Sequence, residues 1–309
     1  MNKLHVNIIG AAQYAGCGCD GVQYGPNAIR ECGLVEKLLA NDVVVSDSGN
    51  MENDASIACT PNEKLRNVEQ IVDFCRRLST KIAMTLREGQ MPLVLGGDHS
   101  LSIGSISGAL EVFGADDLGV IWIDAHADIN TPETSPSGNV HGMTIASLLG
   151  LINNKVLNVG ENSPKLNPGN IIYIATRDMD SGEAQIVKEY GISVVQMKDI
   201  MERGLDASLQ YLQSLLDKLT VSNIYMSIDI DVIDPKLAPG TGVPVPNGID
   251  KSVLYNLLDV IANTNKLRGL ELVEVNPLID DEDNRTSILA VDIINHLVRR
   301  ISHSFKVVE

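Results

Sequence analysis

Aromatic side chains are scarce in this chain of 309 residues, in which Phe, Trp and Tyr together make up 4%. Apolar residues still account for 44% of the sequence, so a sizeable core can form and must be mostly aliphatic. No run approaches the roughly 20 consecutive apolar residues of a membrane-spanning helix. The first ten residues lack both a long apolar stretch and a cleavage-like site. We therefore expect a cytoplasmic protein without a membrane partner.

Positive charge is also in deficit, because 24 Lys and Arg residues face 40 Asp and Glu residues. The resulting net charge of −16 disfavours binding to nucleic acid or to an anionic membrane surface. It favours a cationic partner or bound metal ions, although an acidic solvated surface is the ordinary explanation. We expect no nucleic-acid partner.

The few cysteines provide no disulfide framework. Their number is odd, no two form a Cys-x-x-Cys pair, and Cys17 and Cys19 are too close in sequence for a normal bridge. The pattern is typical of free thiols in a reducing compartment, with a redox or metal role for Cys17 and Cys19 as the alternative. The five residues are Cys17, Cys19, Cys32, Cys59 and Cys75.

Strand and helix signals alternate along the whole chain. Continuous apolar runs typical of buried strands are separated by segments with helical spacing, such as 62–88, which Gly89 ends. This alternation predicts an α/β fold in one domain, residues 1–309, with helices on both faces of a mainly parallel central sheet. The expected strands are 6–9, 43–45, 92–95, 118–123, 171–175, 192–195, 224–228 and 270–275. The expected helices are 62–88, 182–190, 206–219, 251–262 and 286–302, with two more beginning at Ser100, through its hydroxyl as a cap, and near Gly142.

Side chains of the kind that bind metal ions follow three of these strands. After strands 118–123 and 224–228 they occur at every second position, and alternate side chains of an extended strand share a face. Strand 92–95 leads into a further histidine. The carboxyl ends of parallel strands meet at one edge of a sheet, where such folds place their sites. The six candidates are His99, Asp124, His126, Asp128, Asp229 and Asp231.

Four aspartates and two histidines exceed the needs of one ion and predict a binuclear centre. The absence of thiolate argues against structural zinc, and an oxygen-rich set with some imidazole suits manganese better than iron, cobalt or zinc. Paired divalent cations can lower the pKa of a shared water and hold it for attack, which makes hydrolysis the natural reaction class. A purely structural explanation would bury several unpaired charges at high cost.

Two further residues are candidates for proton transfer or for substrate binding. His141 follows an irregular loop and lies too far along the chain to continue the alternation ending at Asp128. Proton transfer therefore suits it better than ligation, with a solvated loop histidine as the alternative. Glu274 closes another strand and could hold a cationic substrate, or could form a structural ion pair.

Five motifs, taken in order, resemble those of the ureohydrolase superfamily, and within it most closely the arginases. They are the segments 96–100 (GGDHS), 124–130 (DAHADIN), 137–142 (SGNVHG), 227–235 (SIDIDVIDP) and 274–277 (EVNP). The resemblance covers nearly the whole chain. It implies a three-layer α/β/α fold, two Mn²⁺ ions per chain, and hydrolysis of L-arginine to L-ornithine and urea by a metal-bridging hydroxide. It also implies a homotrimer or homohexamer.

The resemblance assigns roles around the metals. His99 and Asp128 would bind one ion, His126 and Asp231 the other, and Asp124 and Asp229 would bridge both. Asp128 would also hold the hydroxide and help to move its proton, His141 would shuttle a proton, and Glu274 would pair with the guanidinium group. The residues expected at the substrate α-carboxylate are Asn130, Ser137 and Asn139. Those expected at the α-ammonium group are Asp180 and Glu183.

Several alternatives stay open at this point. An agmatinase or another guanidino-substrate ureohydrolase would share the metal ligands but would not be expected to keep the carboxylate-binding loop. A single-zinc deacetylase would use fewer ligands, and an inactive relative would hold metal without turnover. The chain departs from the arginase pattern at Thr144, at Val243 and in Cys17-Gly18-Cys19, which bears on substrate fine-tuning rather than on the reaction class.

Overall fold

The central sheet is the organising element of the fold. The structure, a computed structural model, describes residues 3–58, 64–152, 157, 159 and 165–305. Eight strands form one sheet in the order β2-β1-β3-β8-β7-β4-β5-β6, and every neighbouring pair is parallel. The prediction of a mainly parallel sheet is therefore confirmed, with no antiparallel pair among the described residues. The strands are β1 His5–Ala12, β2 Val44–Glu52, β3 Met91–Gly96, β4 Leu118–Ile123, β5 Ile171–Ile174, β6 Ser193–Val195, β7 Asn223–Asp229 and β8 Leu267–Val273.

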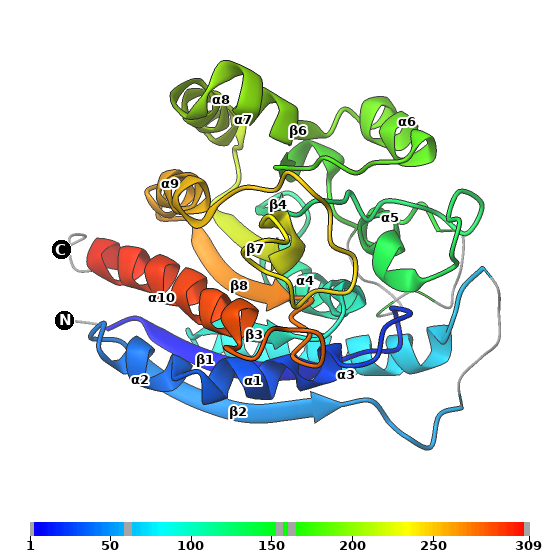
Figure 1. The fold of residues 1–309 in the computed structure, drawn as a ribbon, viewed down its shortest axis with the longest axis horizontal. Coiled ribbons are helices and arrows are strands. Elements are labelled where there is room, and N and C mark those ends of the chain that lie inside the picture. Colours follow the sequence, from blue (N-terminus) through cyan, green and yellow to red (C-terminus); the bar gives the residue numbers. More distant parts are fainter. Residues whose placement is uncertain (1–2, 59–63, 153–156, 158, 160–164, 306–309) are drawn as a thin grey trace.

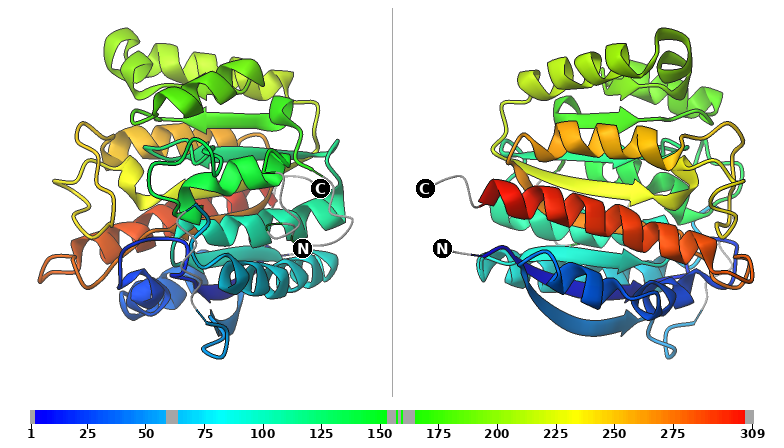
Figure 2. Two further views of the ribbon diagram at one scale, coloured as in Figure 1. Left: turned by 90° about the vertical axis from the view of Figure 1, so that its right-hand side faces the viewer. Right: turned by 60° about the vertical axis from the view of Figure 1, so that its left-hand side comes forward.

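Helices cover both faces of this sheet, which gives three layers (Figures 1 and 2). One set of helices packs with one face of the strands in a first apolar cluster, and a second set packs on the other face in a second cluster. The first set is α1 Gly25–Glu31, α2 Leu34–Leu39, α7 Met197–Arg203, α8 Leu205–Lys218, α9 Lys251–Ala262 and α10 Arg285–Phe305. The second set is α3 Val68–Arg87, α4 Ser102–Phe113, α5 Thr144–Leu149 and α6 Ser181–Glu189.

Period-two alternation divides each strand between the two cores. In β4, Ile121 and Ile123 belong to the first cluster, whereas Val120 and Trp122 belong to the second. All six residues of β4 are buried, as expected for a central parallel strand with helices on both faces. No helix in the described part of the chain is long and apolar enough to span a membrane.

Two helix starts differ from the predictions. The first four described residues of the predicted helix 62–88 precede α3, which starts at Val68 after Asn67 in a left-handed conformation; residues 62 and 63 lie outside the described part. Ser100 does not cap a helix with its hydroxyl, which has no hydrogen-bond partner. Asp98 caps the short 3-10 helix His99–Leu101 instead by accepting the backbone N–H of Ser100, and α4 starts only at Ser102.

The bounds of two strands also differ from the predicted ones, because the local sequence pattern at their ends was weak. Strand β2 continues to Glu52 through polar residues, since it is an exposed sheet edge. Strand β8 begins at Leu267 and ends at Val273, two residues before the predicted end, because Glu274 adopts a positive φ of 65° and its N–H donates to Gly97 O. The short helices α1, α2 and α7 were not predicted.

Candidate metal centre and substrate cavity

The six candidate ligands gather beyond the carboxyl ends of three strands. His99 follows β3, the residues 124–128 follow β4, and Asp229 ends β7. Strands β7 and β4 are neighbours and β8 separates β7 from β3, so the three ends lie close together. The sheet order thus brings together groups up to 132 residues apart in sequence, from His99 to Asp231.

The alternation that predicted the ligands has a different structural origin from the one expected. Strand β4 ends at Ile123, so Asp124, His126 and Asp128 lie in the following loop and not on one face of a strand. Asp128 takes a positive φ of 49°, and Asp231 lies in a 3-10 turn, Ile230–Val232. The side chains still converge because backbone N–H groups hold them: His126 N donates to Asp124 Oδ1 at 2.7 Å and Asp231 N to Asp229 Oδ1 at 2.8 Å.

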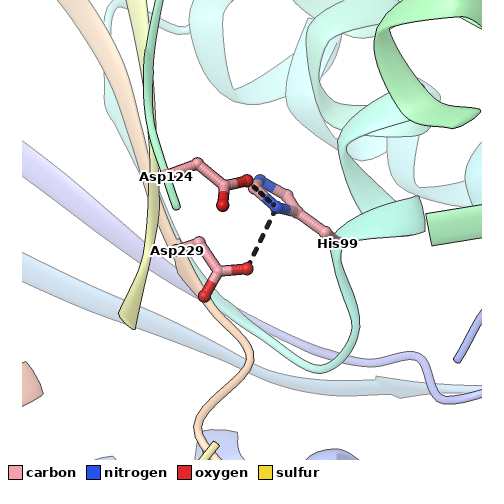
Figure 3. Close-up of side chains that lie close together, drawn as sticks. All are labelled: His99, Asp124 and Asp229. Atoms are coloured by element: carbon pink, nitrogen blue, oxygen red, sulfur yellow. Dashed lines mark ion pairs between the residues drawn. The ribbon is translucent and has the colours of Figure 1, made fainter. Parts of the chain in front are cut away.

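His99 faces three carboxylates through one nitrogen. Its Nδ1 lies 3.2 Å from Asp124 Oδ2, 3.1 Å from Asp128 Oδ2 and 3.2 Å from Asp229 Oδ2. Figure 3 shows His99, Asp124 and Asp229 pointing toward one another from separate segments. Despite these short distances, Nδ1 is buried without a geometrically acceptable hydrogen bond. A buried nitrogen surrounded by oxygens that it does not bond is the arrangement expected of ligands to a common cation.

Two contacts hold the imidazole of His99 in place. Its other ring nitrogen, Nε2, lies 2.8 Å from Ser227 Oγ, and its ring stacks on Trp122 with centroids 4.0 Å apart. Trp122 Nε1 in turn donates to Asp124 Oδ2 at 3.0 Å. When Nδ1 coordinates a cation, Nε2 carries the proton and donates to the serine, an outer contact of the kind that orients metal-binding histidines.

A second group of potential ligands adjoins the first. His126 Nδ1 lies 3.0 Å from Asp231 Oδ2 and 3.5 Å from Asp124 Oδ1. The ligand atoms of His99, Asp124 and Asp229 all lie within 4.8 Å of one another, as do those of Asp124, His126 and Asp231. Asp124 belongs to both groups and contributes a different oxygen to each histidine. Two adjacent cation positions with a shared carboxylate therefore fit these residues.

Without cations the cluster holds excess negative charge. Burial raises the pKa of Asp229 well above its ordinary value, with further increases from the charges of Asp231 and Asp124. Burial and the charge of Asp124 likewise raise the pKa of Asp231 to about 6. Burial alone would lower the pKa of His126, but its contacts with Asp124 and Asp231 raise it well above its ordinary range. Protons thus take the place that cations would occupy, and bound cations would displace them.

The cluster opens into a cavity of about 440 Å³. Its lining contains seven carboxylate side chains and, among the residues that the structure describes, no lysine or arginine. All thirteen predicted site residues lie at this cavity or directly behind it: eleven line its wall, and the other two, His99 and Asp124, are buried against Asp128 and Asp229. The lining is His126, Asp128, Asn130, Ser135, Pro136, Ser137, Asn139, His141, Gly142, Asp178, Asp180, Glu183, Asp229, Asp231, Val243 and Glu274.

Glu274 and His141 form a pair at the wall of the cavity. His141 Nδ1 lies 3.3 Å from Glu274 Oε1, which also accepts the backbone N–H of His99 at 2.8 Å. Burial would lower the pKa of His141, but the contact with Glu274 and the charges of Asp128 and Asp98 raise it to about 9. In the metal-free protein the imidazole therefore holds a proton at neutral pH, and its position at the cavity wall suits proton transfer.

Asp180 and Glu183, two acidic residues at the cavity, are held in place by hydrogen bonds at the N-terminus of α6. Asp180 caps the helix and Glu183 bonds back to the Asp180 N–H, so the two form a capping box. Asp180 Oδ2 also accepts Asn130 Nδ2 at 3.0 Å, and Glu183 Oε1 accepts the N–H of Ile129. Burial, with the charge of Asp128, raises the pKa of Glu183 to about 7.

No individual role was predicted for several residues that complete the site. Arg177 donates to four backbone carbonyls, those of Asp231, Val232, Val245 and Pro246, and so ties the ligand turn to the loop that carries Val243. Asp178 lines the cavity with a side chain that is 65% exposed. Trp122 and Ser227 each lie two residues before a ligand on a buried strand, and that spacing was the signal for them.

Comparisons with known proteins agree with this geometry. The sequence profile of the Arginase family matches residues 4–299. The chain is 36% identical to an arginase of Bacillus subtilis over 96% of this chain and 98% of that one, and 37% identical to an arginase of Staphylococcus aureus over 94% and 96%. The crystal structure of an arginase from Bacillus cereus superposes with a TM-score of 0.87 at 35% identity, covering 95% of this chain and 98% of that chain.

Proposed function

The chain belongs to the arginase family, and on that premise we propose that it hydrolyses L-arginine to L-ornithine and urea. The observation that carries the proposal is that both groups of potential metal ligands open into one acidic cavity that also holds Asn130, Ser137 and Asn139. Carboxylates suit a guanidinium and an ammonium group, while neutral donors suit a carboxylate. An amino acid with a guanidino side chain carries all three groups.

The proposed cofactor is a pair of Mn²⁺ ions per chain. His99, Asp124, Asp128 and Asp229 would hold one, and Asp124, His126, Asp229 and Asp231 the other. The orphaned Nδ1 of His99 and the lack of thiolate among the ligands support this choice. When bound, such a pair lowers the pKa of water and so supplies a nucleophile at neutral pH.

The residues around the centre bind the reacting group and move its protons. Glu274 would accept N–H groups of the guanidinium and place its carbon toward the metal ligands. Asp128 would accept a proton from the attacking water. His141, which lies beside Glu274, would deliver a proton to the departing amine, and the proton held by Asp128 would then return to His141 through solvent, which restores both groups. The proposal thus needs no acid or base other than these two.

The loop 130–139 and the start of α6 would bind the α-carboxylate and α-ammonium groups of the substrate. Asn130, Ser137 and Asn139 would donate to the α-carboxylate, and Asp180 and Glu183 would hold the α-ammonium group. The position of all five on the cavity wall supports this division. A substrate without a carboxylate would leave these donors unused and bind more weakly.

We further propose that residues 1–309 act as one arginase-like catalytic domain, in the cytoplasm and as a homotrimer or homohexamer. The single continuous sheet supports the first part, since the helices α1–α10 contribute to the apolar clusters on its two faces. The resemblance to arginases supports the oligomer.

A substrate comparison tests the function. Purified protein loaded with manganese is assayed for urea with L-arginine, agmatine and 4-guanidinobutyrate at equal concentrations. The proposal expects urea chiefly from L-arginine. Faster release from agmatine would transfer the assignment to an agmatinase, and no urea from L-arginine would overturn it.

A further inference from the structure

The end of the cavity that would bind the substrate α-carboxylate carries an excess of negative charge. Seven carboxylates line it, and the side chains expected at the α-carboxylate, Asn130, Ser137 and Asn139, are neutral. Two metal ions would balance part of this charge, but they would lie at the far, guanidinium end. An anionic group that binds at Asn130, whose Nδ2 donates to Asp180 Oδ2 at 3.0 Å, would therefore meet repulsion unless a cation lies nearby.

Arg66 is a cation in that position. Its Nη1 lies 3.4 Å from Asn139 Oδ1, and its backbone N–H donates to Gly138 O at 3.0 Å. The next residue, Asn67, donates its Nδ2 to Ala15 O at 3.0 Å and leads into α3. The segment 66–67 is thus bonded on both sides, and Arg66 extends from a fixed backbone toward the carboxylate-binding loop.

The contact with Arg66 also determines how the Asn139 amide is oriented. A guanidinium group only donates hydrogen bonds, so the atom of Asn139 facing it must be the oxygen. The amide nitrogen, Nδ2, is then directed away from Arg66 and stays available to donate to an anion. On its other side lies Gly18, where an added Cβ would come within 3.3 Å of Nδ2. A glycine between Cys17 and Cys19 therefore leaves the amide room.

Arg66 has no competing acidic partner. Its side chain is exposed, and no carboxylate in the described part of the chain forms an ion pair with it. Arg77 on α3, by contrast, forms an ion pair with Asp73. An arginine that is held in place, bonded to a substrate-binding amide and free of a carboxylate can pair with the carboxylate of a ligand.

We propose that Arg66 is a specificity-determining residue, which orients the Asn139 amide and attracts the α-carboxylate of the amino-acid substrate. The inference rests on the proposed function, since it concerns the carboxylate of the same substrate. It assigns discrimination between an amino acid and the corresponding decarboxylated amine partly to a cation outside the cavity wall. The guanidinium end of the substrate is untouched by this interaction.

The test compares Arg66→Met and Arg66→Lys with Arg76→Met, a matched change of an exposed arginine on α3 that does not line the cavity. All are assayed as manganese-loaded protein. Arg66→Met should raise the KM for L-arginine by about 1.5-fold to fivefold, the range for an exposed charge pair, and leave kcat unchanged. Arg66→Lys should recover part of the loss, because it keeps the charge without the planar fork. Arg76→Met should match the unaltered protein.

Inhibition supplies a readout that a purely structural role would not move. Arg66→Met should weaken inhibition by L-ornithine, which has an α-carboxylate, and leave inhibition by putrescine unchanged. Equal weakening of both inhibitors, or a fall in kcat at constant KM, would overturn the inference while leaving the proposed function intact. If the unaltered protein releases no urea from L-arginine, the proposed function fails, and direct binding of L-ornithine against putrescine still decides the role of Arg66.

Discussion

At the scale of single residues, Asp128 connects the metal ligands with the chemistry. It contacts His99 at 3.1 Å, lines the cavity, and its charge acts on both His141 and Glu183. Its left-handed backbone, with φ of 49°, is uncommon for an aspartate and marks a position that the surrounding structure holds in place. Asp178 offers a comparison, because it lines the same cavity from a largely exposed position.

We therefore expect Asp128→Asn to lower kcat for L-arginine by about 100-fold or more, the range for loss of a group that handles a proton. The asparagine keeps the size of the side chain, so the thermal midpoint should change little. Asp178→Asn is the matched control and should keep activity within about tenfold. Turnover by Asp128→Asn at the rate of the unaltered protein would refute the assigned role.

His141 gives a prediction about pH. Its pKa is about 9 in the folded chain, above the ordinary histidine value of about 6.5, so it binds its proton more tightly when folded. This stabilisation is fully present below about pH 6.5 and is lost as pH rises through about 9, and it amounts to at most about 3 kcal/mol. We therefore expect His141→Asn to lower the free energy of unfolding of the metal-free protein. The loss should be larger at pH 6 than at pH 10. Urea denaturation at both values measures this, and an equal difference at the two pH values would contradict it.

The residues of the site could be predicted because their chemistry is visible in sequence, whereas the contacts that hold them could not. Asp124, His126 and Asp128 stand out as ligands wherever they lie, and β4 ends at Ile123 as predicted. The loop conformation that brings their side chains together, with a positive φ at Asp128, has no signal in the sequence. Arg177 carries no local signal for its role, since its four acceptors are backbone carbonyls in segments 54 to 69 residues away.

At the scale of elements, Arg177 links two loops that meet at the cavity. It is partly buried, its charge lies near Asp231 and Asp124, and its four hydrogen bonds hold the turn of Asp231 against the loop 240–246. A lysine could not reproduce this fork of donors.

Arg177→Met should consequently weaken manganese binding by about 10-fold to 100-fold, the range for contacts that orient metal ligands, and lower thermal stability. Arg177→Lys should be intermediate in both. Calorimetric titration of manganese into the metal-free variants measures the affinity. An affinity equal to that of the unaltered protein would show that Arg177 does not position Asp231.

The packing of α4 on α3 supports the site from behind, since α4 directly follows the turn of His99. The two helices cross closely at glycines: a Cβ at Gly104 would lie 2.6 Å from Cys75 O, and one at Gly108 would lie 2.5 Å from Ser79 O. Gly104→Ala should therefore destabilise the protein by about 2 kcal/mol. Gly169→Ala, where the nearest atom would be 3.4 Å away, is the control and should cost less in a urea denaturation series. Equal costs would contradict the close crossing.

Elements with strong local patterns were predictable, and those defined by tertiary contacts were not. Buried strands such as β4 are continuous apolar runs in the sequence, which predicted five of the eight strands to within two residues at each end. The exceptions are β1, which ends three residues later than predicted, β2, a polar sheet edge, and β8, which begins three residues earlier than predicted. The helices α1, α2 and α7 have at most seven residues, too few for a periodic apolar pattern to be distinctive.

At the scale of the whole molecule, the order of the strands in the sheet brings the functional residues together. Parallel strands in the order β3-β8-β7-β4 place ligands from three distant segments at one edge, where all of them except the half-buried His126 are buried. The strand order itself could not be predicted from the sequence, because each buried strand presents similar aliphatic residues to its neighbours. The net charge of −16 finds part of its explanation in the carboxylates of this site.

The most direct test of the account is a manganese titration of metal-free protein, with urea release from L-arginine followed at each addition and the thermal midpoint recorded in parallel. The account predicts that activity rises until two equivalents per chain have bound and then stays constant, with the thermal midpoint rising because cations replace repulsion among buried carboxylates. Full activity at one equivalent, or urea release that does not depend on metal, would contradict the two-metal centre on which the proposed function depends.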